Sequence, residues 1–252
     1  MPTSIHPIAE SLRADLIAHA RAEYPRECCG VIIKTAAGHR YHRARNVLSG
    51  DDAGDRFELH PADLAAAEDE GAVLAIVHSH PDACANPSQA DRVMCERTEC
   101  AWVIVGYPSE AIVTLEPSGY EAPLVGREFH HGTLDCYTLI RDYYRTRLGI
   151  DLPDFRRDDA WWERGETLYR DGFADAGFVA VDGEPQAHDV LLMQVATRGI
   201  ENHGAVFVGD GTILHHLYGR LSGHDVWGGY WKQHTTLVLR HRDLMQVTEV
   251  GA

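Results

Sequence analysis

The side chains with the clearest potential for chemistry follow one apolar stretch. His78 and His80 alternate on an extended segment, so their imidazoles project to the same side. The run over 72–77 before them is short, apolar and β-branched, which predicts a buried strand. Ser88 stands where a helix N-cap belongs, and Asp91 shares its face of that helix. Two imidazoles and a carboxylate would thus meet at one point, a three-ligand set for Zn²⁺ with one open position.

A chance His-x-His pair is the simplest competing interpretation, because the chain contains 16 histidines. A rival metal site would combine His78 and His80 with Cys84 or Cys95. The longer spacing argues against both alternatives. His-x-His, seven residues, Ser, two residues and Asp resembles the metal signature of the JAMM (MPN+) metalloprotease family, including the proline after the second histidine.

The JAMM resemblance implies a role for each matching residue. His78, His80 and Asp91 would bind zinc, and Glu27, which stands where the family has a glutamate on an earlier strand, would be the general base. Ser88 would help to hold the tetrahedral oxyanion. Zinc lowers the pKa of a bound water toward neutrality and polarises a scissile carbonyl, while a nearby carboxylate moves the proton.

A second set of reactive residues lies in the other half of the chain. Asp135 is a suitable N-cap for a helix over 136–148, which places Cys136 in its first turn. The helix dipole favours an anion there, so we expect a stabilised thiolate, although a lone cysteine at a helix start is usually structural. Further on, 189–195, 203–209 and 212–216 are predicted strands, the last two forming a hairpin.

This order resembles the NlpC/P60 family of papain-like cysteine peptidases. The resemblance implies that Cys136 is the nucleophile, His203 the general base and His215 the residue that orients the imidazole. His216 competes with His215 for that third role. The backbone N–H at Cys136 is a candidate oxyanion donor.

The remaining patterns predict two domains, of α/β and α+β class. Residues 1–120 would form a JAMM/MPN-like α/β domain, 121–131 a linker, and 132–252 a papain-like NlpC/P60 α+β domain. In the first domain we expect helices over 7–22, 61–70 and 88–100, and strands at 31–33, 41–47, 57–59, 72–77, 101–105 and 111–115. In the second domain we expect an aromatic helix within 155–169, in the core or lining the substrate groove, then a loop at 224–231 and a closing strand at 235–239.

Composition narrows the function classes. The 252 residues are 44% hydrophobic and 24% charged, which is ordinary for a globular protein. A formal net charge of −15, with both signs mixed along the chain, argues against nucleic acid or an anionic membrane surface as partner. No apolar run is long enough for a membrane span, and no secretory signal is predicted, so we expect synthesis and folding in a cytoplasm. The six cysteines show no disulfide-scaffold spacing.

The two motif sets in this order resemble the tail assembly protein K family of long-tailed bacteriophages and prophages. This resemblance implies a tail-tip hydrolase, made in the host cytoplasm and carried in the virion tail. Its C-terminal domain would be a thiol peptidase that aids cell-wall penetration, and its N-terminal domain a zinc peptidase or isopeptidase. Peptidoglycan stem peptides, by family analogy at a γ-D-glutamyl–diamino acid bond, would be the substrate of the thiol domain. Other tail-tip proteins would be partners and, during assembly, substrates of the zinc domain. Two alternatives stay open: a structural tail-tip plug or assembly factor with occluded or inactive sites, and a cellular hydrolase that uses the zinc site alone on a sulfur-carrier or ubiquitin-like tail.

Overall fold

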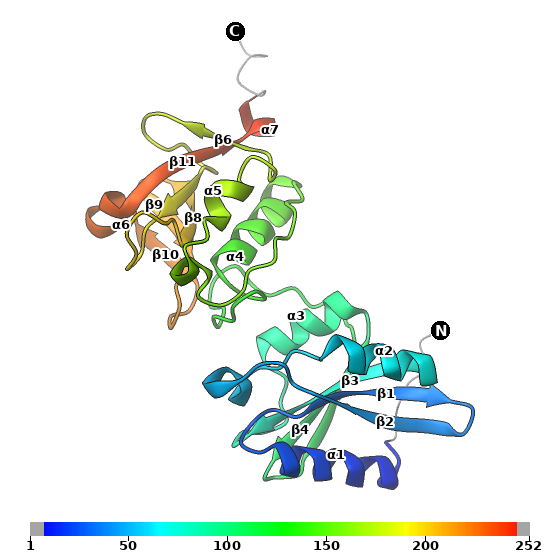
Figure 1. Cartoon of the computed structure of the whole chain (residues 1–252). Coiled ribbons are helices and arrows are strands. Elements are labelled where there is room, and N and C mark those ends of the chain that lie inside the picture. Colours follow the sequence, from blue (N-terminus) through cyan, green and yellow to red (C-terminus); the bar gives the residue numbers. More distant parts are fainter. Residues whose placement is uncertain (1–7, 246–252) are drawn as a thin grey trace. The chain divides into compact units, whose positions relative to one another are not determined.

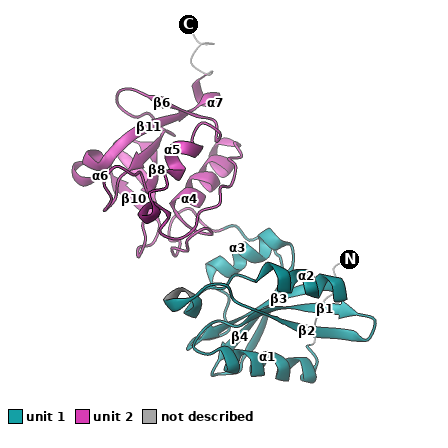
Figure 2. Cartoon of the chain, viewed as in Figure 1, with its two compact units in different colours: residues 1–121 teal, residues 122–252 magenta. Residues whose placement is uncertain are grey.

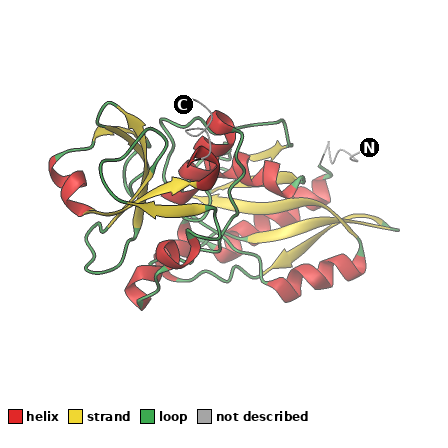
Figure 3. Ribbon diagram, turned by 90° about the horizontal axis from the view of Figure 1, so that it is seen from above, coloured by secondary structure: helices red, strands yellow, loops and turns green. Residues whose placement is uncertain are grey.

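The chain divides into two compact units, residues 1–121 and residues 122–252 (Figure 2). The structure is a computed structural model that describes residues 8–245. Both units contain helices as well as strands (Figure 3). Among the described residues, no helix combines the length and the apolar character that crossing a membrane requires.

Unit 1 is built around one sheet, whose strands lie in the order β2-β1-β3-β4-β5. The strands β3 and β4 run parallel and the other neighbours are antiparallel. The elements of unit 1 are α1 (Glu10–Glu23), β1 (Cys29–Thr35), β2 (Gly38–Ala44), η1 (Gly50–Gly54), α2 (Pro61–Glu70), β3 (Ala72–Pro81), α3 (Gln89–Thr98), β4 (Ala101–Tyr107) and β5 (Ile112–Leu115).

Helices cover both faces of this sheet, with α1 and α2 on opposite sides (Figure 1). Leu12 and Leu16 of α1 are buried in a core cluster that includes Val77 of β3. Ala67 of α2 belongs to the other cluster, against which Ile76 packs. Because side chains alternate along a strand, the two histidines of β3 project from the face that α2 covers.

Most predicted elements of unit 1 are present. The helix expected over 7–22 is α1; residue 7 itself lies outside the described residues. The helix at 61–70 has the predicted bounds, with Pro61 in its first turn. The strand expected at 57–59 was wrong: Leu59 makes an isolated bridge to Asn46, whose side chain also accepts from Glu58 N–H and donates to the Arg56 carbonyl. These side-chain bonds replace the ladder that a strand needs.

Unit 2 contains a second sheet, antiparallel throughout, in the order β10-β9-β8-β7-β11-β6. Its elements are α4 (Cys136–Tyr143), η2 (Tyr144–Leu148), η3 (Trp161–Arg164), α5 (Leu168–Gly172), β6 (Phe178–Val181), β7 (Val190–Met193), β8 (His203–Gly209), β9 (Thr212–His215), β10 (Gly223–Val226), α6 (Gly229–His234), β11 (Thr235–His241) and α7 (Arg242–Met245).

Each face of the second sheet has its own core. Ile140 of α4 packs in a cluster that contains Val206 of β8. The opposite face carries Ala205 and Phe207, against which Trp231 of α6 packs. Alternation along β8 therefore places His203 on the same face as Ala205 and Phe207, and Gly204 on the face of α4.

Two expectations for unit 2 were wrong, and the helix predicted over 136–148 is present. The segment over 155–169 is not a helix: it is largely irregular, with the short η3 ending at Gly165, whose φ of 79° is left-handed. The loop expected at 224–231 is instead strand β10 followed by α6. The helix over 136–148 is α-helical to Tyr143 and continues as a wider π turn that ends at Gly149. The predicted closing strand, β11, lies between β7 and β6 within the sheet.

The segment between the units is bound to each of them at its ends. Within unit 1, the Glu96 carboxylate accepts hydrogen bonds from the backbone N–H groups of Ser118, Gly119 and Tyr120. Within unit 2, Arg127 is fully buried and pairs with Asp142 at 2.7 Å. These contacts order both flanks of the chain that joins the units.

Candidate functional site

In unit 1, His78, His80 and Asp91 converge at the end of β3 and the start of α3. The Nε2 atoms of the two histidines are 3.0 Å apart. Asp91 Oδ1 lies 3.2 Å from His78 Nε2, and Asp91 Oδ2 lies 3.4 Å from His80 Nε2. The potential ligand atoms of the three residues all lie within 4.8 Å of one another. Imidazole nitrogens and a carboxylate oxygen directed at one point fit a bound divalent metal ion.

The surroundings of these ligands fix part of their orientation. The Nδ1 atom of His80 lies 2.9 Å from the Cys84 carbonyl, so Nδ1 carries the proton and Nε2 presents its lone pair. His78 stacks on Phe57 with ring centroids 4.8 Å apart, and its Nδ1 is buried without a hydrogen-bond partner. Burial alone would raise the pKa of Asp91, but its interactions with the neighbouring His78 and His80 and the hydrogen bond from the Ser88 backbone hold it well below its usual range.

Ser88 is the N-cap of α3 and forms a capping box with Asp91. Ser88 Oγ accepts from the Asp91 N–H at 3.0 Å, and Asp91 Oδ2 accepts from the Ser88 N–H at 2.7 Å. The cap therefore fixes the carboxylate beside the histidines. The hydroxyl hydrogen of Ser88 stays free to donate to another group.

Glu27 lies just before β1 and is 4% exposed. Burial raises its pKa to about 9, and the negative charge of Asp91 contributes to this shift. The protonation of Glu27 is thus coupled to the charge of Asp91, a candidate metal ligand. The two cysteines of the rival site do not share this position: Cys84 is exposed, and Cys95 Sγ contacts the Cys100 and Leu115 carbonyls.

In unit 2, Asp135 caps α4 and places Cys136 in its first turn. Asp135 Oδ1 accepts from the Thr138 N–H at 2.8 Å, and Arg157 Nε lies 2.9 Å from Oδ2. Burial alone would raise the pKa of Asp135, but the charge of Arg157 and the Thr138 hydrogen bond bring it below its ordinary value. The buried carboxylate therefore stays ionised beside the thiol.

The expected stabilisation of the Cys136 thiolate was wrong for this arrangement. Burial raises the pKa of the thiol, and the negative charge of Asp135 raises it further. Hydrogen bonds from Tyr169 and the Gly204 backbone oppose this shift without reversing it. Desolvation and a like charge thus outweigh the position at the helix start.

Histidines from β8 and β9 form a connected hydrogen-bond chain. His203 Nε2 is 3.0 Å from His215 Nδ1, and His215 Nε2 is 3.0 Å from Asp225 Oδ2. Burial lowers the pKa of His203 to about 3, so its ring is neutral. His216, the competitor for the third role, points elsewhere: it packs on Phe129, and neither of its ring nitrogens forms a hydrogen bond of normal geometry.

The Cys136 thiol contacts strand β8, which carries His203, at the backbone of Gly204. Its hydrogen-bond partners within residues 8–245 are the Tyr169 hydroxyl, at 3.0 Å, and the Gly204 backbone; it makes no hydrogen bond to His203. Catalytic hydrogen bonds are commonly absent or long before substrate binds. The structure therefore joins the two histidines directly and places the Cys136 thiol against Gly204, the residue next to His203.

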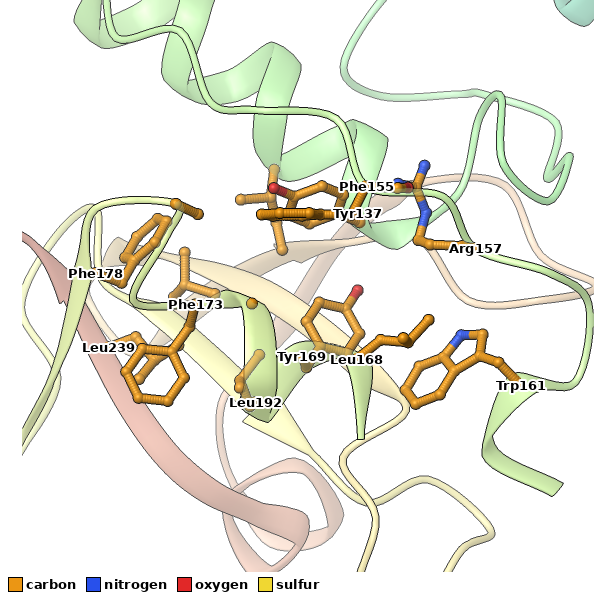
Figure 4. Close-up of a pocket in the computed structure, with 14 residues that line it drawn as sticks. Tyr137, Phe155, Arg157, Trp161, Leu168, Tyr169, Phe173, Phe178, Leu192 and Leu239 are labelled. Atoms are coloured by element: carbon orange, nitrogen blue, oxygen red, sulfur yellow. The ribbon is translucent and has the colours of Figure 1, made fainter. Parts of the chain in front are cut away.

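Sequence patterns missed Tyr169 and Asp225. Tyr169 lies on α5 and borders an apolar cavity of about 40 Å³, among the side chains of Tyr137, Leu168 and Trp161 (Figure 4). Its only local signal was an aromatic-rich segment, which more often marks a core. Asp225 lies in a segment that was expected to be a loop, where an acidic residue is ordinary.

Both halves of the chain match known families. Residues 9–116 match the family described as prokaryotic homologs of the JAB domain, and residues 126–240 match the NlpC/P60 family. Fold and site thus define a two-domain protein with a JAB-like N-terminal domain and an NlpC/P60 C-terminal domain. The predicted fold class is confirmed.

Two relatives align with this chain over most of their length. Tail tip assembly protein K of Escherichia phage N15 is 43% identical over 231 residues, 91% of this chain and 93% of that protein. Tail tip assembly protein K of Escherichia phage lambda is 37% identical over 185 residues, 73% of this chain and 89% of that protein. A crystal structure of an NlpC/P60 family protein from Bacillus cereus aligns with a TM-score of 0.33 at 14% identity, covering 88% of this chain and 65% of that one. The chain belongs to the tail tip assembly protein K family, and the resemblance inferred from its motifs is confirmed.

Proposed function

We propose that this protein is a tail-tip hydrolase whose C-terminal domain is a thiol peptidase acting on peptidoglycan peptides. The observation that carries the proposal is the junction of α4 and β8: Cys136 contacts the Gly204 backbone, and the preceding residue, His203, is hydrogen-bonded to His215. A thiol, a neutral imidazole and a group that orients this imidazole are what cysteine catalysis requires.

The reaction follows from these roles. The Cys136 sulfur attacks the carbonyl carbon of the scissile amide while its proton passes to His203, and the backbone N–H at Cys136 donates to the oxyanion. The imidazolium of His203 then protonates the leaving nitrogen, and the C–N bond breaks to leave a thioester. Water then attacks the thioester while His203 accepts its proton, the C–S bond breaks to release the carboxylic acid, and His203 returns the proton to the Cys136 sulfur.

Substrate and setting are proposed from the family. By analogy with NlpC/P60 peptidases, the bond would join γ-D-glutamate to a diamino acid in the stem peptide. Cleavage would open the cell wall for the tail, which places the protein at the virion tail tip after assembly in the host cytoplasm. Other tail-tip proteins would be its partners.

Digestion of purified peptidoglycan tests this activity. We expect the wild-type protein to release stem peptides that mass spectrometry identifies, and Cys136→Ala to release none. Cys84→Ala removes an exposed cysteine of unit 1 and should cleave like the wild type. Release by Cys136→Ala, or by neither protein, would refute the thiol-peptidase proposal, and the second result would favour the structural plug.

For unit 1 we propose a zinc peptidase or isopeptidase that acts during tail assembly. His78, His80 and Asp91 would hold the ion, which supplies carbonyl polarisation and activation of water at neutral pH. The positive charge of the ion would lower the pKa of Glu27, which burial raises in its absence, so that Glu27 could accept the proton of the attacking water and pass it to the leaving nitrogen. The Ser88 hydroxyl would donate to the oxyanion. The convergence of three ligand atoms supports this proposal.

Metal analysis of the purified protein tests the ligand assignment. We expect about one zinc per chain in the wild type and far less in Asp91→Ala, because two imidazoles alone hold zinc weakly. His39→Ala is the matched control, since His39 is exposed on β2. Equal zinc in the wild type and Asp91→Ala would refute the assignment.

A further inference from the structure

We propose that Asp225 is a positioning residue that determines which ring nitrogen of His203 is free to accept a proton. This inference rests on the proposed thiol-peptidase function and adds a fourth residue to its catalytic set. Asp225 lies on β10, outside the segments for which the sequence motifs predict chemistry. It would act through His215 and not by touching the substrate.

The pairing of β9 with β10 brings the carboxylate to the imidazole. Gly223 lies opposite His215, and Asp225 lies opposite Ile213. Residues two apart on a strand share a face, so Asp225 is the diagonal neighbour of His215 on the same face of the sheet. Across this strand pair, His215 Nε2 lies 3.0 Å from Asp225 Oδ2.

The hydrogen-bond chain fixes the proton positions in order. An ionised carboxylate only accepts, so His215 must carry its proton on Nε2. A neutral imidazole has one N–H, and therefore His215 Nδ1 is an acceptor. His203 Nε2, 3.0 Å from that acceptor, must then carry the proton of its own ring. The lone pair of His203 is left on Nδ1, the nitrogen that would accept the thiol proton in the proposed reaction.

Packing holds the rings of His203 and His215 in this orientation. The Trp231 indole lies against both imidazoles, with its ring centroid 4.6 Å from that of His215 and 6.0 Å from that of His203. Both histidines are nearly inaccessible to solvent. A flip of the His215 ring would therefore break two hydrogen bonds in a buried place, where water replaces neither.

Asp225 also forms a surface ion pair with Arg220, and this contact can be tested separately from its hydrogen bond to His215. Arg220 Nη1 lies 3.4 Å from Asp225 Oδ2, and both side chains are partly exposed. Exposed pairs of this kind contribute little to stability. Removing Arg220 thus leaves the carboxylate on His215, whereas removing Asp225 leaves the His215 N–H without its acceptor.

The test measures ring tautomers and thiol reactivity in the full-length protein. The variants are Asp225→Ala and the isosteric Asp225→Asn, with His224→Ala and Arg220→Ala as controls. His224 is the exposed neighbour of Asp225 on β10. Two-bond ¹H–¹⁵N correlations of ¹⁵N-histidine-labelled protein report which nitrogen carries each proton. Iodoacetamide alkylation of Cys136, followed by mass spectrometry, reports the reactivity of the thiol.

We expect His203 and His215 to be protonated on Nε2 in the wild type and in both controls. Asp225→Ala should lose this pattern and be alkylated about tenfold more slowly, the effect of one charge-assisted hydrogen bond. The alkylation rate of Asp225→Asn should lie between those of the wild type and Asp225→Ala, because the amide oxygen still accepts a hydrogen bond. If the alanine variant does not fold, Asp225→Asn alone serves as the test. A wild-type His215 protonated on Nδ1, or unchanged signals and alkylation in both Asp225 variants, would overturn the inference.

Peptidoglycan digestion separates this inference from the proposed function. If the tautomers and the alkylation rate depend on Asp225 but the protein releases no peptide, the positioning role of Asp225 is supported and the proposed substrate is contradicted. If Asp225→Ala and His224→Ala release peptide equally, with unchanged kcat and KM, the positioning role of Asp225 is contradicted and the peptidase proposal is retained.

Discussion

Cys136 Sγ lies 3.0 Å from the hydroxyl oxygen of Tyr169, so the proposed nucleophile is hydrogen-bonded to a phenol. Burial raises the pKa of Tyr169 well above its ordinary value, and the charge of a Cys136 thiolate raises it further. The phenol therefore keeps its proton, which it can donate to the sulfur when the thiol ionises. The helix that carries Tyr169 is attached by a two-bond ion pair between Arg170 and Glu201, with contacts of 2.6 and 3.1 Å.

Replacing Tyr169 with phenylalanine should raise the pKa of Cys136 still further, because it removes a donor that stabilises the thiolate. One hydrogen bond to a charged group is worth about 1.5–3 kcal/mol, so we expect alkylation at neutral pH to slow by about tenfold or more. The pH dependence of iodoacetamide alkylation measures this shift. Tyr137→Phe is the control, since the Tyr137 hydroxyl donates to the Pro153 carbonyl. Equal or faster alkylation of Tyr169→Phe would contradict the assigned donor role.

Gly204→Ala should disturb the contact between α4 and β8. A Cβ atom at this position would lie 2.8 Å from Ile140 Cδ1 and 3.3 Å from the Tyr169 hydroxyl. Overpacking of this kind costs about 1–3 kcal/mol, and we expect a lower free energy of unfolding and slower alkylation of Cys136. Urea denaturation measures the first effect. Gly223→Ala, where a Cβ meets nothing within 4 Å, should be near neutral; equal losses in both variants would argue against the steric explanation.

His216→Leu should make unit 2 less sensitive to acid. Burial lowers the pKa of His216 to about 4, so below pH 6.5 the unfolded chain binds a proton that the folded chain does not. The stability that the neutral ring allows is complete above pH 6.5 and is lost as the pH falls toward 4. We expect the leucine variant to retain roughly 3 kcal/mol more of its neutral-pH stability at pH 4 than the wild type does.

Unfolding at pH 7 and pH 4, followed by hydrogen exchange in β9, measures the effect of this substitution. The pKa of His203, lowered by burial to about 3, gives a similar acid dependence that the variant keeps. His224→Leu, at an exposed position, should behave like the wild type. A His216→Leu variant that loses as much stability in acid as the wild type would show that the buried ring is not responsible.

Removing the proposed zinc ion should loosen unit 1 and leave unit 2 unchanged. A ligand at 1,000 times its dissociation constant stabilises the folded state by about 4 kcal/mol, and chelation withdraws that contribution. We expect hydrogen exchange to accelerate in α3 and at the end of β3 after treatment with a chelator, with β8 as internal reference. Asp91→Ala should show no response to chelation. Faster exchange in β8, or an equal response of the variant, would point away from this metal centre.

The sequence by itself determined the features that depend on local spacing. Ser88 and Asp135 are caps because a short polar side chain before a helix satisfies its free N–H groups, and both caps are present. His78 and His80 share a side because strand side chains alternate, and this alternation brings their Nε2 atoms to 3.0 Å. Such rules act within a few residues, so a linear pattern contains all that they need.

Only the tertiary structure decided which distant groups complete the sites. Asp225 reaches His215 because β10 pairs with β9, and a segment that resembled a loop gave no sign of this pairing. Tyr169 reaches Cys136 from the end of a segment in which an aromatic helix was expected. Arg157, from the same segment, instead binds Asp135 in the interior. These contacts depend on the order of the strands in the sheet and on which irregular segments pack against it. Both are determined by the burial of side chains that are far apart in sequence. Local periodicity does not encode this burial.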